Sequence, residues 1–303
     1  MAWNFQNELS LFGPESPRLE NRGLRFSRDY CRSVCQSHYE NFSVASLLLP
    51  RHLRSHFHAI YAYCRWSDDL ADETGDRDTA LSLLAWWRNE LQLSFENKSN
   101  HPVMIALHDT VTEFSIPPEP FLNLLTAFEQ DQRVNRYDSF EQLLGYCRNS
   151  ANPVGHLVLY LFRSFDPARA ELSDHICTGL QLANFWQDVA RDSTIDRLYL
   201  PKEDLARFGY SQEDWRANRF TPAFRELMTF EVDRTRQFFE RGKPLLAMLP
   251  HRLRCNIDLF ILGGEAVLAG IERVGYDVWK TRPVVSKWQK LKILSRASFG
   301  LFG

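Results

Sequence analysis

Residues 65–73 read RWSDDLADE, and this acidic stretch lies in a continuous helical pattern that begins just after Pro50. Asp68 and Asp72 are four positions apart, so at about 100° per residue they project from nearly the same helix face, with Asp69 beside them. Like charges on one stripe repel each other and destabilise a helix unless a cation compensates them. The stretch therefore predicts a helix that binds a cation.

Residues 181–192 read QLANFWQDVARD and place a second polar stripe on another predicted helix. Asn184, Asp188 and Asp192 follow one face over two turns, and Gln181 stands at its start. Mg²⁺ takes oxygen ligands, usually one or two carboxylates, and completes its shell with waters and substrate phosphates. Two facing stripes therefore predict a diphosphate that is bridged by Mg²⁺ ions and stabilised as a leaving group. One such motif alone is more often a solvated helix face, but two inside otherwise apolar helices favour the metal site.

Nearly every segment from about Ser27 onward has helical spacing, and strand-like alternation is almost absent. We therefore predict an all-α single domain at residues 25–297, with an N-terminal tail at 1–24 and a C-terminal tail at 298–303. Beyond the helix after Pro50, the main helices are expected at 103–114, 120–133, 140–148, 154–165, 168–192, 222–246 and 252–276.

The composition is that of a globular protein with a sizeable core, since hydrophobic residues make up 44% and charged residues 24%. The net charge of −2 argues against a nucleic-acid-binding protein, which usually has a basic excess. The six cysteines are scattered without a Cys-x-x-Cys pair, so we expect reduced thiols and a cytoplasmic location. No run approaches roughly 18 apolar residues, and the start lacks a signal-peptide pattern, so membrane contact would be peripheral at most.

The two acidic motifs resemble those of the squalene/phytoene synthase family, the head-to-head prenyl synthases. The resemblance runs from about Tyr30 to Lys292 and includes DRLYLP after the second motif, the segment YCRNSANPVGHL, and the ending GYDVW…RPVVSKWQK. The family implies an isoprenoid synthase fold, with helices around a central apolar cavity. It also implies an enzyme that uses Mg²⁺ and prenyl diphosphates.

The resemblance implies a role for individual residues of this chain. The metal ligands would be Asp68, Asp69, Asp72, Asn184, Asp188 and Asp192. The catalytic residues would be Asp68, Asp72, Asp188, Asp192 and Tyr146. The substrate-binding residues would be His38, Asn41, Arg65, Gln181, Gln187, Arg197 and Tyr199. Taken alone, His38 and Tyr146 fit satisfied core residues equally well.

Three departures from the family pattern bear on the substrate. Residues 38–42 read HYENF where many members have a Ser-x-Ser-Phe loop after the histidine, and Gln187 stands where they have an arginine. Gly264 stands near the position of an expected tyrosine. These changes remove groups that an enzyme holding two prenyl diphosphates needs more than an enzyme holding one.

The segments SHYENFSVASLLLP and NFWQDVARD resemble one branch, the hydroxysqualene synthases of the bacterial three-enzyme squalene route to hopanoids. That resemblance implies a lyase that converts presqualene diphosphate and water to hydroxysqualene and diphosphate. The polar candidates for holding the capturing water are Glu40, Asn41, Gln187 and Glu265. Two alternatives stay open: a synthase that condenses two allylic diphosphates to presqualene diphosphate, dehydrosqualene or phytoene, and a non-catalytic helical assembly protein of the same superfamily.

The C-terminal stretch at 280–296 carries six lysines and arginines, no acid, and interleaved apolar residues. It fits either a last core helix with a basic exposed face or a peripheral anchor at the inner face of a membrane. A partner enzyme, a presqualene diphosphate synthase, would hand over the substrate.

Overall fold

The computed structural model describes residues 3–16, 22–37 and 49–284. His38, Asn41 and the predicted C-terminal tail lie outside these residues. The described residues are helical apart from connections and one isolated bridge between Arg136 and Leu198, so the predicted all-α class is confirmed.

The chain divides into two compact units. The first contains residues 1–133 and 156–164, and the second contains residues 134–155 and 165–303. The single domain predicted at 25–297 stays a prediction.

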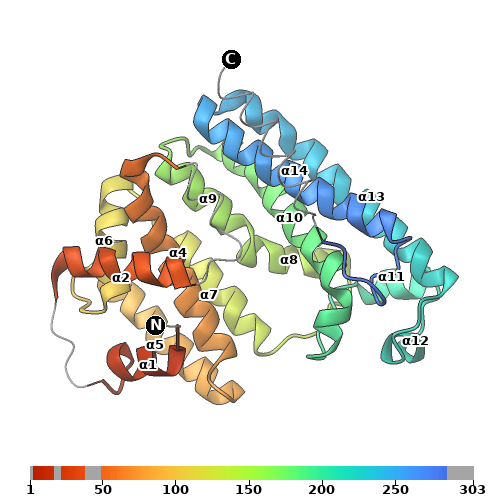
Figure 1. Ribbon diagram of the computed structural model, residues 1–303, viewed down its shortest axis with the longest axis horizontal. Helices are drawn as coiled ribbons and strands as arrows, with labels where there is room; N and C mark the ends of the chain where they lie inside the picture. The colour runs from red at the N-terminus through yellow and green to blue at the C-terminus, as the bar shows by residue number, and fades with distance from the viewer. Residues whose placement is uncertain (1–2, 17–21, 38–48, 285–303) are drawn as a thin grey trace. The chain divides into compact units, whose positions relative to one another are not determined.

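The first unit is built on helix α4 (Arg54–Asp72), which follows a short 3₁₀ turn, η1 (Arg51–Leu53). Its neighbours in contact are α2 (Gly23–Ser37), α5 (Arg77–Phe95), α6 (Pro102–Phe114) and α7 (Glu119–Asp131). Figure 1 shows these helices in red to yellow around α4. The core contains three fully buried residues with aromatic rings, Tyr63, Trp66 and Trp87, and Trp87 stacks with each of the other two. These rings fix the face that α4 turns inward and so decide which of its polar residues remain accessible.

The predicted N-terminal tail is wrong for part of its length, because Phe5–Phe12 forms helix α1. Asn4 caps this helix, since its side chain accepts a hydrogen bond from Asn7 N at 3.1 Å. Phe5 and Phe12 are the buried residues of this helix. They are seven positions apart and so lie on the same helix face. The segment is too short for a helical period of apolar residues to be recognised in the sequence. Only its packing in the structure shows that it is a helix.

The second unit is built on α10 (Pro167–Ser193), which packs against α13 (Pro222–Gly242) and α14 (His251–Arg273). Its other elements are α8 (Phe140–Ser150), α11 (Lys202–Arg207), α12 (Gln212–Arg216) and η2 (Lys243–Met248). Helix α9 (Asn152–Leu161) begins in this unit and continues into the first.

Glycines bring α10, α13 and α14 close together around one ring. A Cβ atom on Gly264 would lie 2.4 Å from Phe239 Cζ, and one on Gly179 would lie 3.0 Å from Phe239 Cε1. Gly264 thus makes room for Phe239, so the tyrosine expected near this position could not be accommodated without moving that ring.

The predicted helices are present, and four of them end earlier than expected, among them α7, which ends at Asp131. Helix α9 ends before Arg163, which has a left-handed φ of 51°. Helix α13 ends where the chain tightens into η2, and α14 ends before Gly275 and Tyr276, both of which have positive φ. Left-handed residues end helices because they turn the chain out of the helical path.

Candidate active site

The first acidic motif occupies the last turns of α4, where one arginine joins its acids. Arg65 Nη1 lies 3.1 Å from Asp68 Oδ2, and Arg65 Nη2 lies 3.5 Å from Glu73 Oε1. The same Nη2 also donates to Asp69 Oδ1. The guanidinium thus compensates part of the acidic charge that the sequence places on this helix.

The three aspartates of this motif differ in exposure. Asp69 is fully buried, whereas the Asp68 side chain is 43% exposed and Asp72 is exposed. The second oxygen of Asp69 accepts a hydrogen bond from Trp3 Nε1 at 3.1 Å. Asp68 and Asp72 are therefore the aspartates of this motif that reach the surface.

The surroundings of Asp68 favour the protonated form of its carboxyl group. Desolvation by its surroundings raises the pKa of Asp68 to about 6, although Arg65 acts in the opposite direction. The neighbouring charge of Asp72 raises this pKa further. A cation bound beside neighbouring carboxylates stabilises their ionised forms, because it offsets their mutual repulsion.

The second motif occupies the C-terminal half of α10. Asn184 is exposed, and Asp188 and Asp192 are partly buried on the same stripe. Burial raises the pKa of Asp192 to about 7, the charge of Asp188 raises it further, and the cation of Arg197 opposes both. This motif, like the first, is therefore an acidic cluster with incomplete compensation.

An arginine from the segment after α14 supplies part of that compensation. Arg282 Nη2 donates to Asp188 Oδ2 at 3.1 Å, and Arg282 Nε donates to Asp188 Oδ1. The ion pair raises the pKa of Arg282. Arg282 also donates from Nη2 to Gln187 Oε1 at 3.3 Å, while Gln187 Nε2 donates to the carbonyl oxygen of Pro283 at 2.5 Å. Gln187 therefore anchors the chain that carries Arg282.

Aromatic rings lie beside the second motif. Tyr199 stacks on Phe185 with ring centroids 3.7 Å apart, and Tyr146 lies 6.0 Å from Tyr199 and 6.1 Å from Phe185. Tyr137 also stacks with Tyr199, with ring centroids 5.9 Å apart. Such rings present π-faces that stabilise a nearby cation.

Contacts with residues 135 and 136 fix the connection after α10 and so position Arg197 and Tyr199. Leu198 N donates to Asn135 O at 2.9 Å, and Arg136 forms an ion pair with Asp196. Arg197 N donates to Asp192 O at 2.9 Å. The predicted substrate-binding residues Arg197 and Tyr199 thus lie next to the second motif, and their role in binding stays a prediction.

The structure groups the predicted residues by motif. Arg65, Asp68, Asp69 and Asp72 lie together on α4, while α10 and its neighbours carry Tyr146, Gln181, Asn184, Gln187, Asp188, Asp192, Arg197 and Tyr199. Among residues 3–16, 22–37 and 49–284, no three His, Cys, Asp or Glu side chains converge in the manner of a preformed metal site.

Sequence reasoning missed two residues of these clusters, Trp3 and Arg282. Trp3 lies in the segment that was interpreted as a tail, and Arg282 was counted only as one of the basic residues near the C-terminus. Each of these residues is far along the chain from its partner, so no helical period in the sequence relates the two.

Comparison with known proteins decides the family. The model of the family described as squalene/phytoene synthase matches residues 35–289. The chain belongs to the squalene/phytoene synthase family. It is therefore a member of a family of enzymes of isoprenoid biosynthesis, and the predicted resemblance is confirmed.

Individual family members are similar over nearly their whole length. The chain is 30% identical to a phytoene synthase of Arthrospira platensis over 284 residues, which are 89% of this chain and 92% of that protein. It is 46% identical to a crystal structure of the squalene synthase HpnC from Alicyclobacillus acidocaldarius, with a TM-score of 0.80 over 84% of this chain and 95% of that one. A dehydrosqualene synthase structure, 24% identical, gives a TM-score of 0.82 over 92% of this chain and 98% of that one and so supports the fold.

In the part of this family member that the structure describes, no helix is both long enough and apolar enough to cross a membrane.

Proposed function

We propose that this family member is a hydroxysqualene synthase, which converts presqualene diphosphate and water to hydroxysqualene and diphosphate. The observation that carries the proposal is the pair of acidic stripes, on α4 and on α10, in each of which an arginine lies against an aspartate. Such stripes suit a diphosphate that arrives with divalent cations. The 46% identity to a protein described as a squalene synthase supports the squalene route.

Mg²⁺ is the cation that fits the donors of this chain. Asp68, Asp72, Asn184, Asp188 and Asp192 offer hard oxygen ligands, and partial burial raises the pKa values of Asp68 and Asp192, so a nearby cation would favour their ionised forms. Both oxygens of Asp69 already accept hydrogen bonds, so we assign Asp69 to holding Arg65. Bound Mg²⁺ would supply Lewis-acid assistance to the departure of diphosphate.

The residues of the chain then have separate tasks. Arg65 in the first unit and Arg197 in the second each offer a guanidinium fork, whose geometry matches that of phosphate oxygens. The carbon–oxygen bond to diphosphate breaks with its electron pair on the leaving group, and the cyclopropylcarbinyl cation of the substrate rearranges. Tyr146, Phe185 and Tyr199 present ring faces to this cation. Water adds to the rearranged cation and loses one proton, which gives hydroxysqualene.

Gln187 and Arg282 distinguish this site from the family pattern. Gln187 replaces an expected arginine, and Arg282 brings a guanidinium to the same place from a different part of the chain. One cation is therefore retained beside Asp188, while the side chain at 187 contacts the backbone instead of a phosphate. We propose that this arrangement suits an enzyme that holds a single diphosphate.

The alternative function is the condensation of two allylic diphosphates to presqualene diphosphate, dehydrosqualene or phytoene. It is favoured by the curated phytoene synthases, which are 28–30% identical to this chain. A non-catalytic assembly protein would not need two acidic stripes, whose repulsion costs stability.

The deciding experiment is to incubate the purified protein and Mg²⁺ with presqualene diphosphate and, separately, with farnesyl diphosphate. Mass spectrometry identifies the products. Hydroxysqualene from the first substrate and no product from the second would support the proposal. A condensed product from farnesyl diphosphate alone would place the protein among the condensing synthases.

We further propose a cytoplasmic enzyme that contacts the inner membrane face through the basic stretch at 280–296, and that receives substrate from a presqualene diphosphate synthase. Only residues 280–284 of that stretch belong to the described part of the chain. Co-sedimentation with anionic liposomes, with and without residues 285–303, tests the contact, and equal recovery of both proteins would contradict it.

A further inference from the structure

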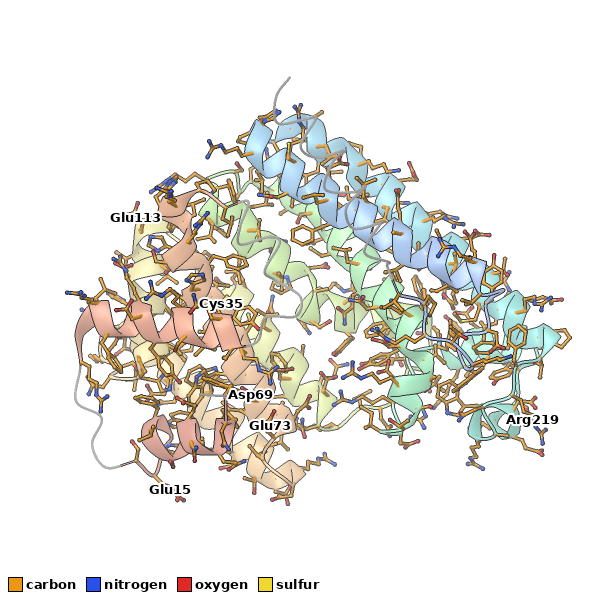
Figure 2. The ribbon with its side chains drawn as sticks, in the orientation of Figure 1. Glu15, Cys35, Asp69, Glu73, Glu113 and Arg219 are labelled. Atoms are coloured by element: carbon orange, nitrogen blue, oxygen red, sulfur yellow. The ribbon has the colours of Figure 1, made fainter. Side chains whose placement is uncertain are left out.

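Helix α1 contacts the first acidic motif at a place that the proposed function does not use. Trp3 Nε1 donates to Asp69 Oδ2 at 3.1 Å, and Gln6 Nε2 donates to the carbonyl oxygen of Glu73 at 2.7 Å. Figure 2 shows Asp69 and Glu73 on the C-terminal part of α4, beside α1. The N-terminal segment therefore reaches both the middle and the end of the acidic stretch.

Packing of helix α1 against α4 and α2 supports this contact. Phe5 is buried and meets Trp66 of α4 edge-on, with ring centroids 5.3 Å apart. Phe12 is buried and meets Tyr30 of α2 edge-on at 5.0 Å. Glu8 accepts a hydrogen bond from Tyr30 Oη at 2.8 Å. Because both ends of α1 are anchored by rings, the position of Trp3 is defined by packing and not by one hydrogen bond.

Asp69 connects Trp3 to Arg65. Its buried carboxylate accepts from Trp3 with one oxygen and from Arg65 with the other. A buried carboxylate oxygen without a donor is strongly unfavourable, so removal of the indole N–H would drive Asp69 to another rotamer. Arg65 would lose the partner that holds its guanidinium, which also contacts Asp68 at 3.1 Å.

We propose that Trp3 is a positioning residue of the first acidic motif, which acts through Asp69 to orient Arg65 toward a diphosphate. The inference rests on the proposed function for the identity of the ligand. Trp3 contacts the motif at Asp69, which the proposed function does not use as a metal ligand, so we assign its effect to orientation.

The test is the Trp3→Phe variant, which keeps an aromatic ring and removes only the indole donor. We expect the Kd for inorganic diphosphate in the presence of Mg²⁺, measured by calorimetry, to rise roughly threefold to tenfold. The KM for the prenyl diphosphate should rise by a similar factor, while kcat changes less. The melting temperature should stay close to that of the wild-type protein.

The matched control is Glu8→Ala, which removes a hydrogen bond between α1 and α2 and leaves the bond between Trp3 and Asp69 in place. We expect this control to lower the melting temperature without changing the diphosphate Kd. Unchanged Kd in Trp3→Phe, or equal increases in Trp3→Phe and Glu8→Ala, would overturn the inference.

The two measurements separate this inference from the proposed function. Diphosphate binding that weakens in Trp3→Phe, without turnover of presqualene diphosphate by the wild-type protein, would support the role of Trp3 and remove the proposed reaction. Turnover with normal Kd and KM in Trp3→Phe would remove the role of Trp3 alone. A wild-type protein that binds no diphosphate would overturn both.

Discussion

Arg282 and Asp188 form a two-point ion pair, in which Nη2 donates to Oδ2 at 3.1 Å and Nε donates to Oδ1. Asp188 is also a proposed ligand of Mg²⁺, so Arg282 and the metal ion would compete for the charge of one carboxylate. The guanidinium beside Asp188 is also placed to meet an anionic ligand that arrives with the metal.

Substitution of Arg282 by glutamine should strengthen the binding of a metal ion alone. Removal of a competing cation from Asp188 should lower the Kd for Mn²⁺, used as a spectroscopic substitute for Mg²⁺, by roughly threefold to tenfold. Electron paramagnetic resonance measures the free Mn²⁺. The control is Lys280→Gln, which removes an exposed cation of the same segment. Weaker Mn²⁺ binding in Arg282→Gln would show that Arg282 does not compete for Asp188.

Substitution of Asp188 by alanine should abolish turnover while the fold stays intact. Loss of one ligand of the leaving-group metal should lower kcat by on the order of a hundredfold or more, as other lost transition-state contacts do. Helix content and melting temperature, measured by circular dichroism, should change little. Glu171→Gln, an exposed substitution on the same helix, serves as the control. Activity near the wild-type level in Asp188→Ala would contradict the metal-binding role of α10.

The stability of the metal-free protein should depend on pH through Asp192. Burial, together with Asp188, raises the pKa of Asp192 to about 7, so between about pH 4 and pH 7 the folded state holds a proton that the unfolded state has lost. This contribution to stability is therefore present at low pH and is lost as the pH rises through 7.

Asp192→Asn removes that contribution, and thermal unfolding measures it. The melting temperature of the wild-type protein relative to Asp192→Asn should fall as the pH rises from 5 to 8 without Mg²⁺. Added Mg²⁺ should reduce the difference, because the cation stabilises the ionised carboxylate. A difference between the two proteins that does not vary with pH would contradict the raised pKa.

Substitution of Gly264 by alanine should destabilise the second unit. The added Cβ would lie 2.4 Å from Phe239 Cζ, and overpacking of this kind costs about 1–3 kcal/mol in the free energy of unfolding. Gly263→Ala is a matched control on the same helix, because no atom lies within 4 Å of its added Cβ. The control should be neutral or stabilising by about 0.5–1 kcal/mol, since alanine favours helix over glycine. Equal denaturation midpoints in urea for the two variants would contradict the close packing of Phe239.

The all-α fold and the two acidic helices could be predicted from the sequence because both depend on local spacing. The helix predicted at 168–192 is present as Pro167–Ser193, since its polar and apolar residues repeat with the helical period. The predicted roles of the site residues remain predictions, although Arg65 lies against Asp68, and Arg197 is close enough to Asp192 for its charge to lower the pKa of that carboxyl. The helical order of Phe5–Phe12 could not be predicted, because the stability of so short a helix comes from packing.

The sequence by itself determined the helices, the spacing of their carboxylates and the family to which they point. Only the tertiary structure decided that Asp69 is buried between Trp3 and Arg65, and that Arg282 pairs with Asp188. These partners are 66 and 94 residues apart, whereas helical periodicity relates residues three or four positions apart. Contacts at such separations depend on how helices pack, and packing depends on shapes of side chains from the whole chain.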